Sequence, residues 1–250
     1  MYKAIISDID GTLAPLTMHT EVSDTVKKAI RSLVAKNIVF CLATGKPFSM
    51  VEHLIDDLAI SAPIITDNGA AIFHSTTRKV LWKSELDPAM YDGIIAMTHT
   101  YGKNIRCSDG YSGFDVVDKI PANRTLTKFM LRDFSFSEAD LFVQKVKEMH
   151  HDLSVHKTSS HKGVDFMDIY ITNGEATKNN AVKKVAQILG IKTDEIIGIG
   201  DHYNDISLLE ACGLKVAMGN AVDELKNLAD YIAPSVDNDG VADVIYKYFN

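Results

Sequence analysis

The stretch Asp8-Ile9-Asp10-Gly11-Thr12 follows a short apolar run near the start of the chain. Side chains two residues apart in a strand project to the same face, so Asp8 and Asp10 would lie together while Ile9 points into the core. One carboxylate can then attack while the other handles protons. Gly11 permits a sharp turn, and Thr12 offers a hydroxyl and backbone N–H groups to an anion. This pattern predicts a site for a phosphate and a divalent cation.

The segments around this turn alternate between short apolar runs and amphipathic stretches. Residues 4–7, 38–43 and 64–65 are predicted strands, and residues 22–34 and 47–58 repeat apolar positions at helical spacing. Continuous apolar strands that alternate with helices are typical of a parallel sheet covered on both faces. We therefore expect an α/β fold with a Rossmann-like parallel sheet as its core.

The pattern changes after about residue 80. The segments predicted there have mixed polar faces, with strands at 104–117 and 125–134 and helices at 88–99 and 137–150. From Phe166 the alternation returns, with core strands expected at 166–171 and 195–199 and a helix between them. The sequence therefore predicts a core of residues 1–82 and 167–250, with an inserted α+β cap of residues 83–166.

Composition and charge narrow the class of protein. The 250 residues carry a net charge of −7, which argues against nucleic acid as a partner, because binding to its backbone normally shows as a basic patch. No apolar stretch approaches the about 20 residues of a membrane span, and the start of the chain lacks a signal-peptide pattern. The three cysteines lie far apart, which is typical of reduced thiols. We expect a cytoplasmic protein with no membrane partner.

Further polar residues follow the predicted strands where they could face the first motif. Thr44 and Gly45 come directly after the strand 38–43 and present a hydroxyl and a backbone N–H, a small cradle for an anion. Lys178 lies near the start of a predicted helix. Its ammonium group can stabilise the charge on a nucleophile and a phosphate.

A third group of polar residues follows the strand 195–199, at the carboxyl edge where open α/β sheets bind ligands. Carboxylate oxygens suit Mg²⁺ rather than zinc, and we expect Asp201 to be a direct ligand. Asp205 can bind the metal directly, bind through water or orient its neighbour, and it can also be simply the first acid of a helix. Asn204 can donate to the aspartate or to the phosphoryl group.

Taken in order, four motifs resemble those of the haloacid dehalogenase superfamily: Asp8-Ile-Asp-Gly-Thr, Thr44-Gly45, Lys178 and Gly200-Asp201-His-Tyr-Asn204-Asp205. More narrowly, the chain is similar to the Cof-type phosphatases, which carry a type IIB cap. That similarity lies in Asn68-Gly69-Ala70, in the insert, and in residues 216–221, 229–230 and 239–241. The resemblance spans essentially the whole chain.

The resemblance implies a Mg²⁺-dependent phosphatase that hydrolyses phosphomonoesters of small metabolites, with sugar phosphates expected first, through an aspartyl phosphate. Asp8 suits the nucleophile and Asp10 the general acid and base, although in isolation they could be a turn residue and a helix cap. The expected metal ligands are Asp8, Asp10 through its carbonyl, Asp201 and Asp205. The expected phosphate ligands are Thr12, Thr44, Gly45, Lys178 and Asn204. We expect a monomer or a small homo-oligomer.

Two positions depart from the family pattern. Lys46 stands where members usually have Arg, and it lacks the planar fork that grips a phosphate with two hydrogen bonds. Asn179 stands where members usually have Gly.

Two other functions stay open. One alternative is a phosphomutase of sugar phosphates, which product analysis would distinguish. The other is a catalytically idle metabolite-binding protein, against which the intact set of acidic residues and Lys178 argues.

Overall fold

In the computed structural model, which describes residues 1–16, 21–160 and 162–249, five parallel strands form a central sheet in the order β13-β12-β11-β1-β2. Their bounds are β1 (Ala4–Ser7), β2 (Val39–Leu42), β11 (Ile196–Gly200), β12 (Leu214–Ala217) and β13 (Tyr231–Ile232). β1 and β11 are buried along their whole length, as the apolar runs require in a sheet covered on both faces. The predicted Rossmann-like core is confirmed.

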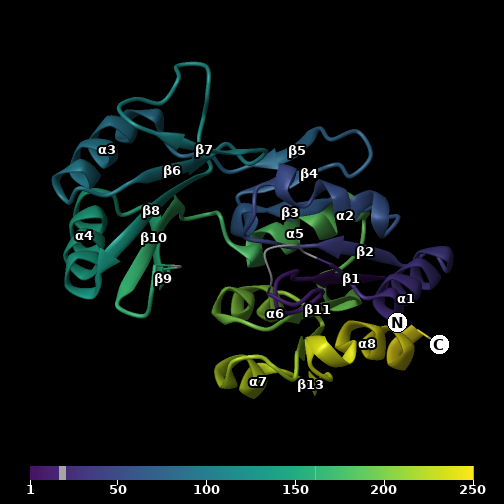
Figure 1. Cartoon of the computed structure of the whole chain (residues 1–250). Coiled ribbons are helices and arrows are strands. Elements are labelled where there is room, and N and C mark those ends of the chain that lie inside the picture. Colours follow the sequence, from purple (N-terminus) through teal and green to yellow (C-terminus); the bar gives the residue numbers. More distant parts are fainter. Residues whose placement is uncertain (17–20, 161, 250) are drawn as a thin grey trace.

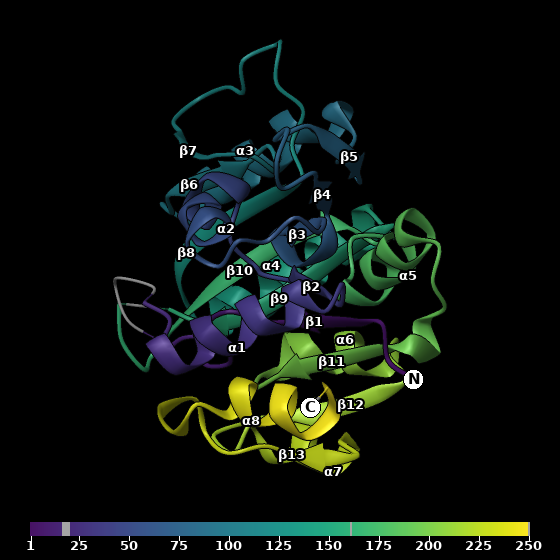
Figure 2. The ribbon, with the colours of Figure 1, turned by 90° about the vertical axis from the view of Figure 1, so that its right-hand side faces the viewer.

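Helices cover both faces of this sheet (Figures 1 and 2). They are α1 (Asp24–Ala35), α2 (Glu52–Asp57), α5 (Lys178–Leu189), α6 (Ile206–Glu210), α7 (Asp223–Leu228) and α8 (Gly240–Phe249). α1 packs against α8, whereas α5 packs against α6. The crossovers from β1 to β2 and from β11 to β12 run in opposite directions along the sheet. Right-handed crossovers therefore place α1 and α6 on opposite faces.

A small antiparallel sheet extends the core beyond β2. It consists of β3 (Ile64–Thr66), β4 (Ala71–Phe73) and β5 (Val80–Lys83). A parallel bridge between Ala43 and Ile65 joins it to the end of β2. The turn between β3 and β4, residues 67–69, consequently lies beside the residues that follow β2.

The cap is a five-stranded antiparallel sheet in the order β7-β6-β8-β10-β9, with two helices (Figure 1). Its elements are α3 (Tyr91–Thr100), β6 (Ile105–Ser108), β7 (Gly113–Val116), β8 (Lys128–Ser135), α4 (Phe136–Met149), β9 (Leu153–Ser159) and β10 (Phe166–Asn173). The sheet and helices share an apolar core of their own, which includes Phe129, Leu131 and Phe142. The predicted α+β cap is confirmed.

Short 3₁₀ helices complete the described secondary structure. They are η1 (Phe48–Met50), η2 (Asp67–Gly69), η3 (Pro88–Met90), η4 (Thr193–Glu195), η5 (Tyr203–Asp205) and η6 (Val236–Asn238). Two of them, η2 and η5, follow strands at the carboxyl edge of the core, where the motif residues gather. In the ranges that the structure describes, no helix has both the length and the apolar character needed to cross a membrane.

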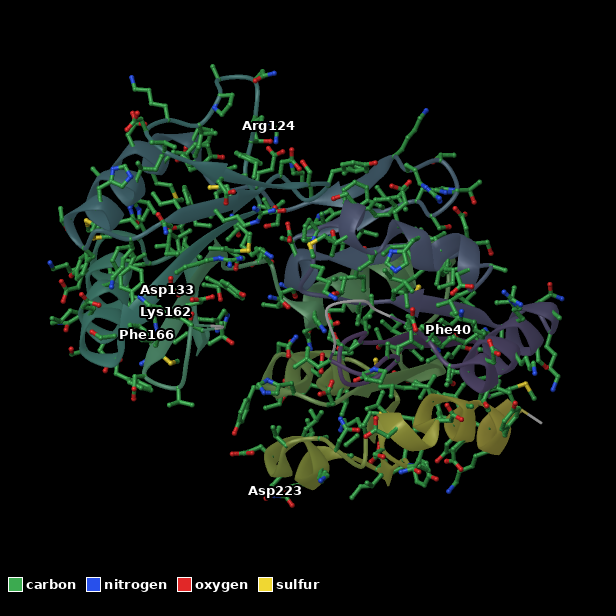
Figure 3. All side chains as sticks on the ribbon, viewed as in Figure 1. Phe40, Arg124, Asp133, Lys162, Phe166 and Asp223 are labelled. Atoms are coloured by element: carbon green, nitrogen blue, oxygen red, sulfur yellow. The ribbon has the colours of Figure 1, made fainter. Side chains whose placement is uncertain are left out.

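Two predicted strands are wrong in their pairing or extent. The strand at 166–171 belongs to the cap sheet, where β10 pairs with β8 and β9, and Figure 3 shows Phe166 in the cap with Asp133, away from Phe40 of the core. Ile169 and Ile171 face the cap core, so the strand alternates as a half-buried antiparallel strand does. Residues 104–117 form two strands, β6 and β7, because Asp109 accepts from two turn amides between them.

The domain limits stay a prediction, and the pairing of β10 bears on one of them. Because β10 runs to Asn173 inside the cap sheet, we propose that the chain returns to the core near Gly174 rather than at residue 167. The other predicted boundary, where the chain leaves the core for the cap after residue 82, falls inside β5. This strand ends at Lys83 and pairs with β4 of the core.

Candidate active site

The predicted site residues meet at the carboxyl ends of three neighbouring parallel strands. Asp8 follows β1, Thr44 follows β2 and Asp201 follows β11. Ser7, the last residue of β1, is in register with Leu42 of β2 and Ile199 of β11. The backbone N–H of Asp8 donates to the carbonyl of Ile199 at 2.9 Å. The parallel sheet thus brings side chains almost 200 positions apart in sequence to one edge.

Lys178 lies between two carboxylates in the interior of this edge. It is the first residue of α5. The residue before it, Thr177, is the N-cap of this helix, and its hydroxyl accepts from the amide of Asn180. Lys178 Nζ donates to Asp8 Oδ1 at 2.5 Å and to Asp205 Oδ1 at 2.6 Å, and the side chain is 1% exposed. Burial opposes the charge, but Asp205 and Asp8 outweigh it and raise the pKa of Lys178, so the ammonium form persists.

Asp201 and Asp205 are held by protein donors. Asp201 Oδ1 accepts from the hydroxyl of Thr12 at 2.7 Å. Asp205 Oδ2 accepts from the backbone amides of Asp201 at 3.0 Å and His202 at 3.1 Å, while its Oδ1 accepts from Lys178. With both oxygens engaged, Asp205 is placed to orient Lys178 and the Asp201 segment.

The acidic cluster fits a divalent cation. Asp8, Asp201 and Asp205 each offer an oxygen, and these atoms lie within 4.8 Å of one another. Burial, and then the charge of Asp205, raise the pKa of Asp8 well above its usual range, and burial raises the pKa of Asp201 to about 6. Lys178 contacts only two of these carboxyl groups, those of Asp8 and Asp205. With all three ionised, the cluster and Lys178 together carry a formal charge of −2. A hard divalent ion such as Mg²⁺ would neutralise it.

Other residues predicted to bind the metal or the phosphate are bonded to neighbouring protein groups. Thr44 is buried, and its Oγ1 accepts from the amide of Lys46 at 3.1 Å. The side chain of Asp10 instead binds Lys46, with Nζ 2.7 Å from Oδ1. Thr12 uses its hydroxyl on Asp201, and Asn204 is exposed and donates weakly to another side chain, Asn68.

Several residues that hold the site were assigned no role from the sequence. Asn220 donates to the carbonyl of Gly11 at 2.8 Å and accepts from the amide of Val236 at 2.9 Å, which fixes the turn of the first motif. In η2, Asp67, Asn68 and Gly69 have successive φ values of 49°, 58° and 101°. Such backbone persists only where the surroundings enforce it. Asn68-Gly69-Ala70 belongs to the resemblance to Cof-type phosphatases, but that resemblance does not indicate which residues η2 contacts.

Gly69 allows η2 to contact the start of α5, and this contact gives a testable prediction. A Cβ at Gly69 would lie 2.2 Å from the carbonyl oxygen of Thr177 and 2.8 Å from the amide nitrogen of Lys178. We expect Gly69→Ala to cost about 1–3 kcal/mol of unfolding free energy and to lower kcat, because Lys178 must move. Gly102→Ala is the matched control, since Gly102 also has a positive φ (62°) but nothing within 4 Å of its Cβ position. Equal losses in the two variants, in chemical denaturation and in activity, would contradict the contact.

The chain is similar to known proteins along almost its whole length. The family model of haloacid dehalogenase-like hydrolases matches residues 5–115 and 114–245. The Bacillus subtilis (strain 168) protein YxeH, whose name marks it as a candidate phosphatase, is 30% identical over 275 residues, 99% of this chain and 98% of the relative. The 5-amino-6-(5-phospho-D-ribitylamino)uracil phosphatase YwtE of the same strain is 30% identical over 285 residues, 96% of each chain. A haloacid dehalogenase-like hydrolase from Bacteroides thetaiotaomicron superposes with a TM-score of 0.85 at 21% identity and covers 100% of both chains.

Proposed function

The chain belongs to the haloacid dehalogenase-like hydrolases, and from this premise we propose that it hydrolyses phosphomonoesters of small sugars or sugar alcohols with Mg²⁺, through an aspartyl phosphate on Asp8. The resemblance to Cof-type phosphatases is confirmed, and the chain is a hydrolase of phosphoric monoesters. The metal, the intermediate and the substrate are the proposal. One observation carries it: Lys178 lies buried between Asp8 and Asp205 at the ligand-binding edge of the sheet.

In the proposed first step, a carboxylate oxygen of Asp8 attacks phosphorus and the bond from phosphorus to the ester oxygen breaks. Asp10 gives its proton to the departing oxygen, so the leaving group departs as a neutral alcohol. The hydroxyl of Thr44 and the amide of Gly45 would bind phosphoryl oxygens, and Lys178 offsets the charge that develops on them.

In the second step, water attacks the phosphorus of the aspartyl phosphate and Asp10 takes its proton. Phosphate then leaves and the Asp8 carboxylate is restored, so that atoms and protons balance over the cycle. When bound, Mg²⁺ would supply positive charge to the phosphoryl group and to the crowded carboxylates. Asp8, Asp201 and the carbonyl of Asp10 would hold it, and we propose that Asp205 acts mainly by orienting Asp201 and Lys178.

The proposed substrate class rests on the substrate for which one relative is named. YwtE is named for a substrate that carries phosphate on a D-ribityl group, which is a primary phosphate ester of a sugar alcohol. The relatives are named as phosphatases, so neither a phosphomutase nor an idle binding protein is favoured. We therefore propose phosphorylated sugars and sugar alcohols as the compounds to test first.

A phosphate-release screen with and without chelator tests this function. Sugar phosphates, sugar-alcohol phosphates, phosphoglycolate, nucleotides and pyridoxal phosphate would be offered with Mg²⁺ and then with EDTA. We expect phosphate release that falls at least about 100-fold on chelation, because a metal contributes several kcal/mol of charge stabilisation, and that returns when Mg²⁺ is added. Isomerised sugar phosphate without free phosphate would indicate a mutase. Hydrolysis that survives chelation would contradict the Mg²⁺ assignment.

A further inference from the structure

Lys128 is a buried lysine of the cap strand β8, and it faces the core rather than the interior of the cap. Its neighbours Phe129 and Leu131 belong to the apolar core of the cap, so alternation along the strand directs Lys128 to the opposite face. Only 2% of its side chain is exposed. Burial of a lysine is unfavourable unless the ammonium group is paired and hydrogen-bonded, which makes its partners informative.

Lys128 pairs with Asp67, a fully buried core residue in the turn after β3. Lys128 Nζ lies 2.7 Å from Asp67 Oδ1. Asp67 Oδ2 accepts from Ser108 Oγ at 2.5 Å and from Thr127 Oγ1 at 2.7 Å. Three cap side chains therefore bind one core carboxylate. We call these four residues, Asp67, Ser108, Thr127 and Lys128, the clamp.

The clamp also binds the backbone of the second motif. Lys128 Nζ donates to the carbonyl of Gly45 at 2.7 Å. The backbone N–H of Asp67 donates to the carbonyl of Lys46 at 3.1 Å. Both members of the buried ion pair thus take a carbonyl from the loop 44–46, one with a side chain and one with the main chain.

The same loop also contacts Asp10, the proposed general acid and base. The N–H of Asn68 donates to the carbonyl of Thr44 at 3.0 Å, so three consecutive carbonyls of the loop are held. Both donor residues, Asp67 and Asn68, have positive φ values. Lys46, whose backbone is fixed in this way, places its Nζ 2.7 Å from Asp10 Oδ1.

We propose that Lys128 is a positioning residue for hydrolysis, acting through Gly45 and Asp67 to hold Lys46 against Asp10. This inference rests on the proposed function of the site. A well-packed apolar pair of similar volume would join cap and core at least as well as a buried ion pair, whereas only a hydrogen-bond donor such as the Lys128 ammonium group can hold the carbonyl of Gly45. Because the clamp spans the two parts of the chain, Lys128 can bind Gly45 and Asp67 only with the cap seated on the core.

Lys128→Met tests the clamp against a matched variant. Lys103 makes the same two kinds of contact within the cap, 2.8 Å to Glu138 Oε2 and 2.8 Å to the carbonyl of Asp133, without touching the core loop. We expect Lys128→Met to lower kcat about 10–100-fold, as small misplacements of catalytic groups do, with KM changed by less than about threefold. Lys103→Met should keep the wild-type kcat.

A double-mutant cycle separates positioning from general destabilisation. If Lys128 acts through Lys46, then Lys128→Met should change kcat by less than about threefold in a Lys46→Met background. Effects that multiply, or an equal loss in Lys103→Met, would overturn the proposal. Should Lys128→Met fail to fold, Thr127→Val removes one hydroxyl from Asp67 at nearly constant volume, and a kcat and KM equal to those of wild type in that variant would also overturn it.

Hydrogen exchange provides a readout that does not need turnover. The amides of Asp67 and Asn68 donate to the loop carbonyls, so Lys128→Met should speed their exchange more than Lys103→Met does. A wild-type protein that hydrolyses no ester would refute the proposed function alone, and the exchange rates would still decide on the clamp. Unchanged exchange at these two amides, with active wild-type protein, would refute the clamp alone.

Discussion

Replacement of Asp8 by Asn is expected to abolish phosphate release, with kcat lowered at least about 10⁴-fold, as when a nucleophile is removed. An amide oxygen is a poor nucleophile, yet it can still accept the hydrogen bond from Lys178 that Asp8 accepts at 2.5 Å. The fold should therefore be retained. Steady-state phosphate release and circular dichroism measure the two properties. Asp92→Asn, which changes an exposed aspartate of α3 in the same way, is the control.

The same variant should be more stable than wild type in the absence of metal. Burial and the charge of Asp205 raise the pKa of Asp8. A carboxyl whose pKa is higher in the folded than in the unfolded state lowers stability above its unfolded pKa. Asp8→Asn removes this penalty, so Tm should rise by a few degrees at neutral pH, and the gain should vanish in acid where Asp8 is protonated in both states. Retained hydrolysis, or a lower Tm at neutral pH, would contradict this description of Asp8.

Lys178→Met is expected to reduce both activity and stability. The buried ammonium group contacts Asp8 and Asp205, and its removal leaves two carboxylates buried without their cation. Breaking such a pair costs about 3–5 kcal/mol, and loss of charge stabilisation at the phosphoryl group should lower kcat at least about 10²–10³-fold. Chemical denaturation and steady-state kinetics measure these losses.

Two further variants separate the two effects of Lys178. Lys183→Met changes an exposed lysine of the same helix and should leave stability and kcat close to wild type. Asp205→Asn in the Lys178→Met background removes one unpaired charge and should recover part of the lost stability, while activity stays low. If Lys178→Met alone were as stable as wild type, the buried ion pairs would not have the role that their geometry indicates.

The position of the site could be predicted from the sequence because parallel strands end at one edge. Asp8, Thr44 and Asp201 each follow an apolar run, and the run's direction is set by the strand–helix alternation. Lys178 required the order of the motifs as well, since a lysine at a helix start has no distinctive local pattern. In the structure Asp8, Asp201 and Lys178 come together at this edge.

Hydrogen-bond partners could not be predicted in this way. Thr12 was expected at the phosphate, but residue type does not say that its hydroxyl turns toward Asp201. The pair of Asp67 and Lys128 joins residues 61 positions apart, one in η2 of the core and the other in the cap strand β8, and nothing local to either residue signals it. The apolar content of residues 166–171 favours a core strand. Their alternation, with Ile169 and Ile171 in the cap core, is instead that of a half-covered antiparallel strand.

Chemical trapping of the phosphorylated enzyme tests the central claim most directly. Asp10→Asn should slow breakdown of the intermediate, since no base then activates water. With an ester whose leaving group needs no proton, such as p-nitrophenyl phosphate, the intermediate should still form, and acid quenching should leave phosphate on the protein. Borohydride reduction followed by peptide mass spectrometry would locate the acyl phosphate. We predict conversion of residue 8 to homoserine, with no such product in Asp8→Asn. Label on another residue, or phosphate release from a wild-type enzyme whose Asp8 is never modified, would contradict the account.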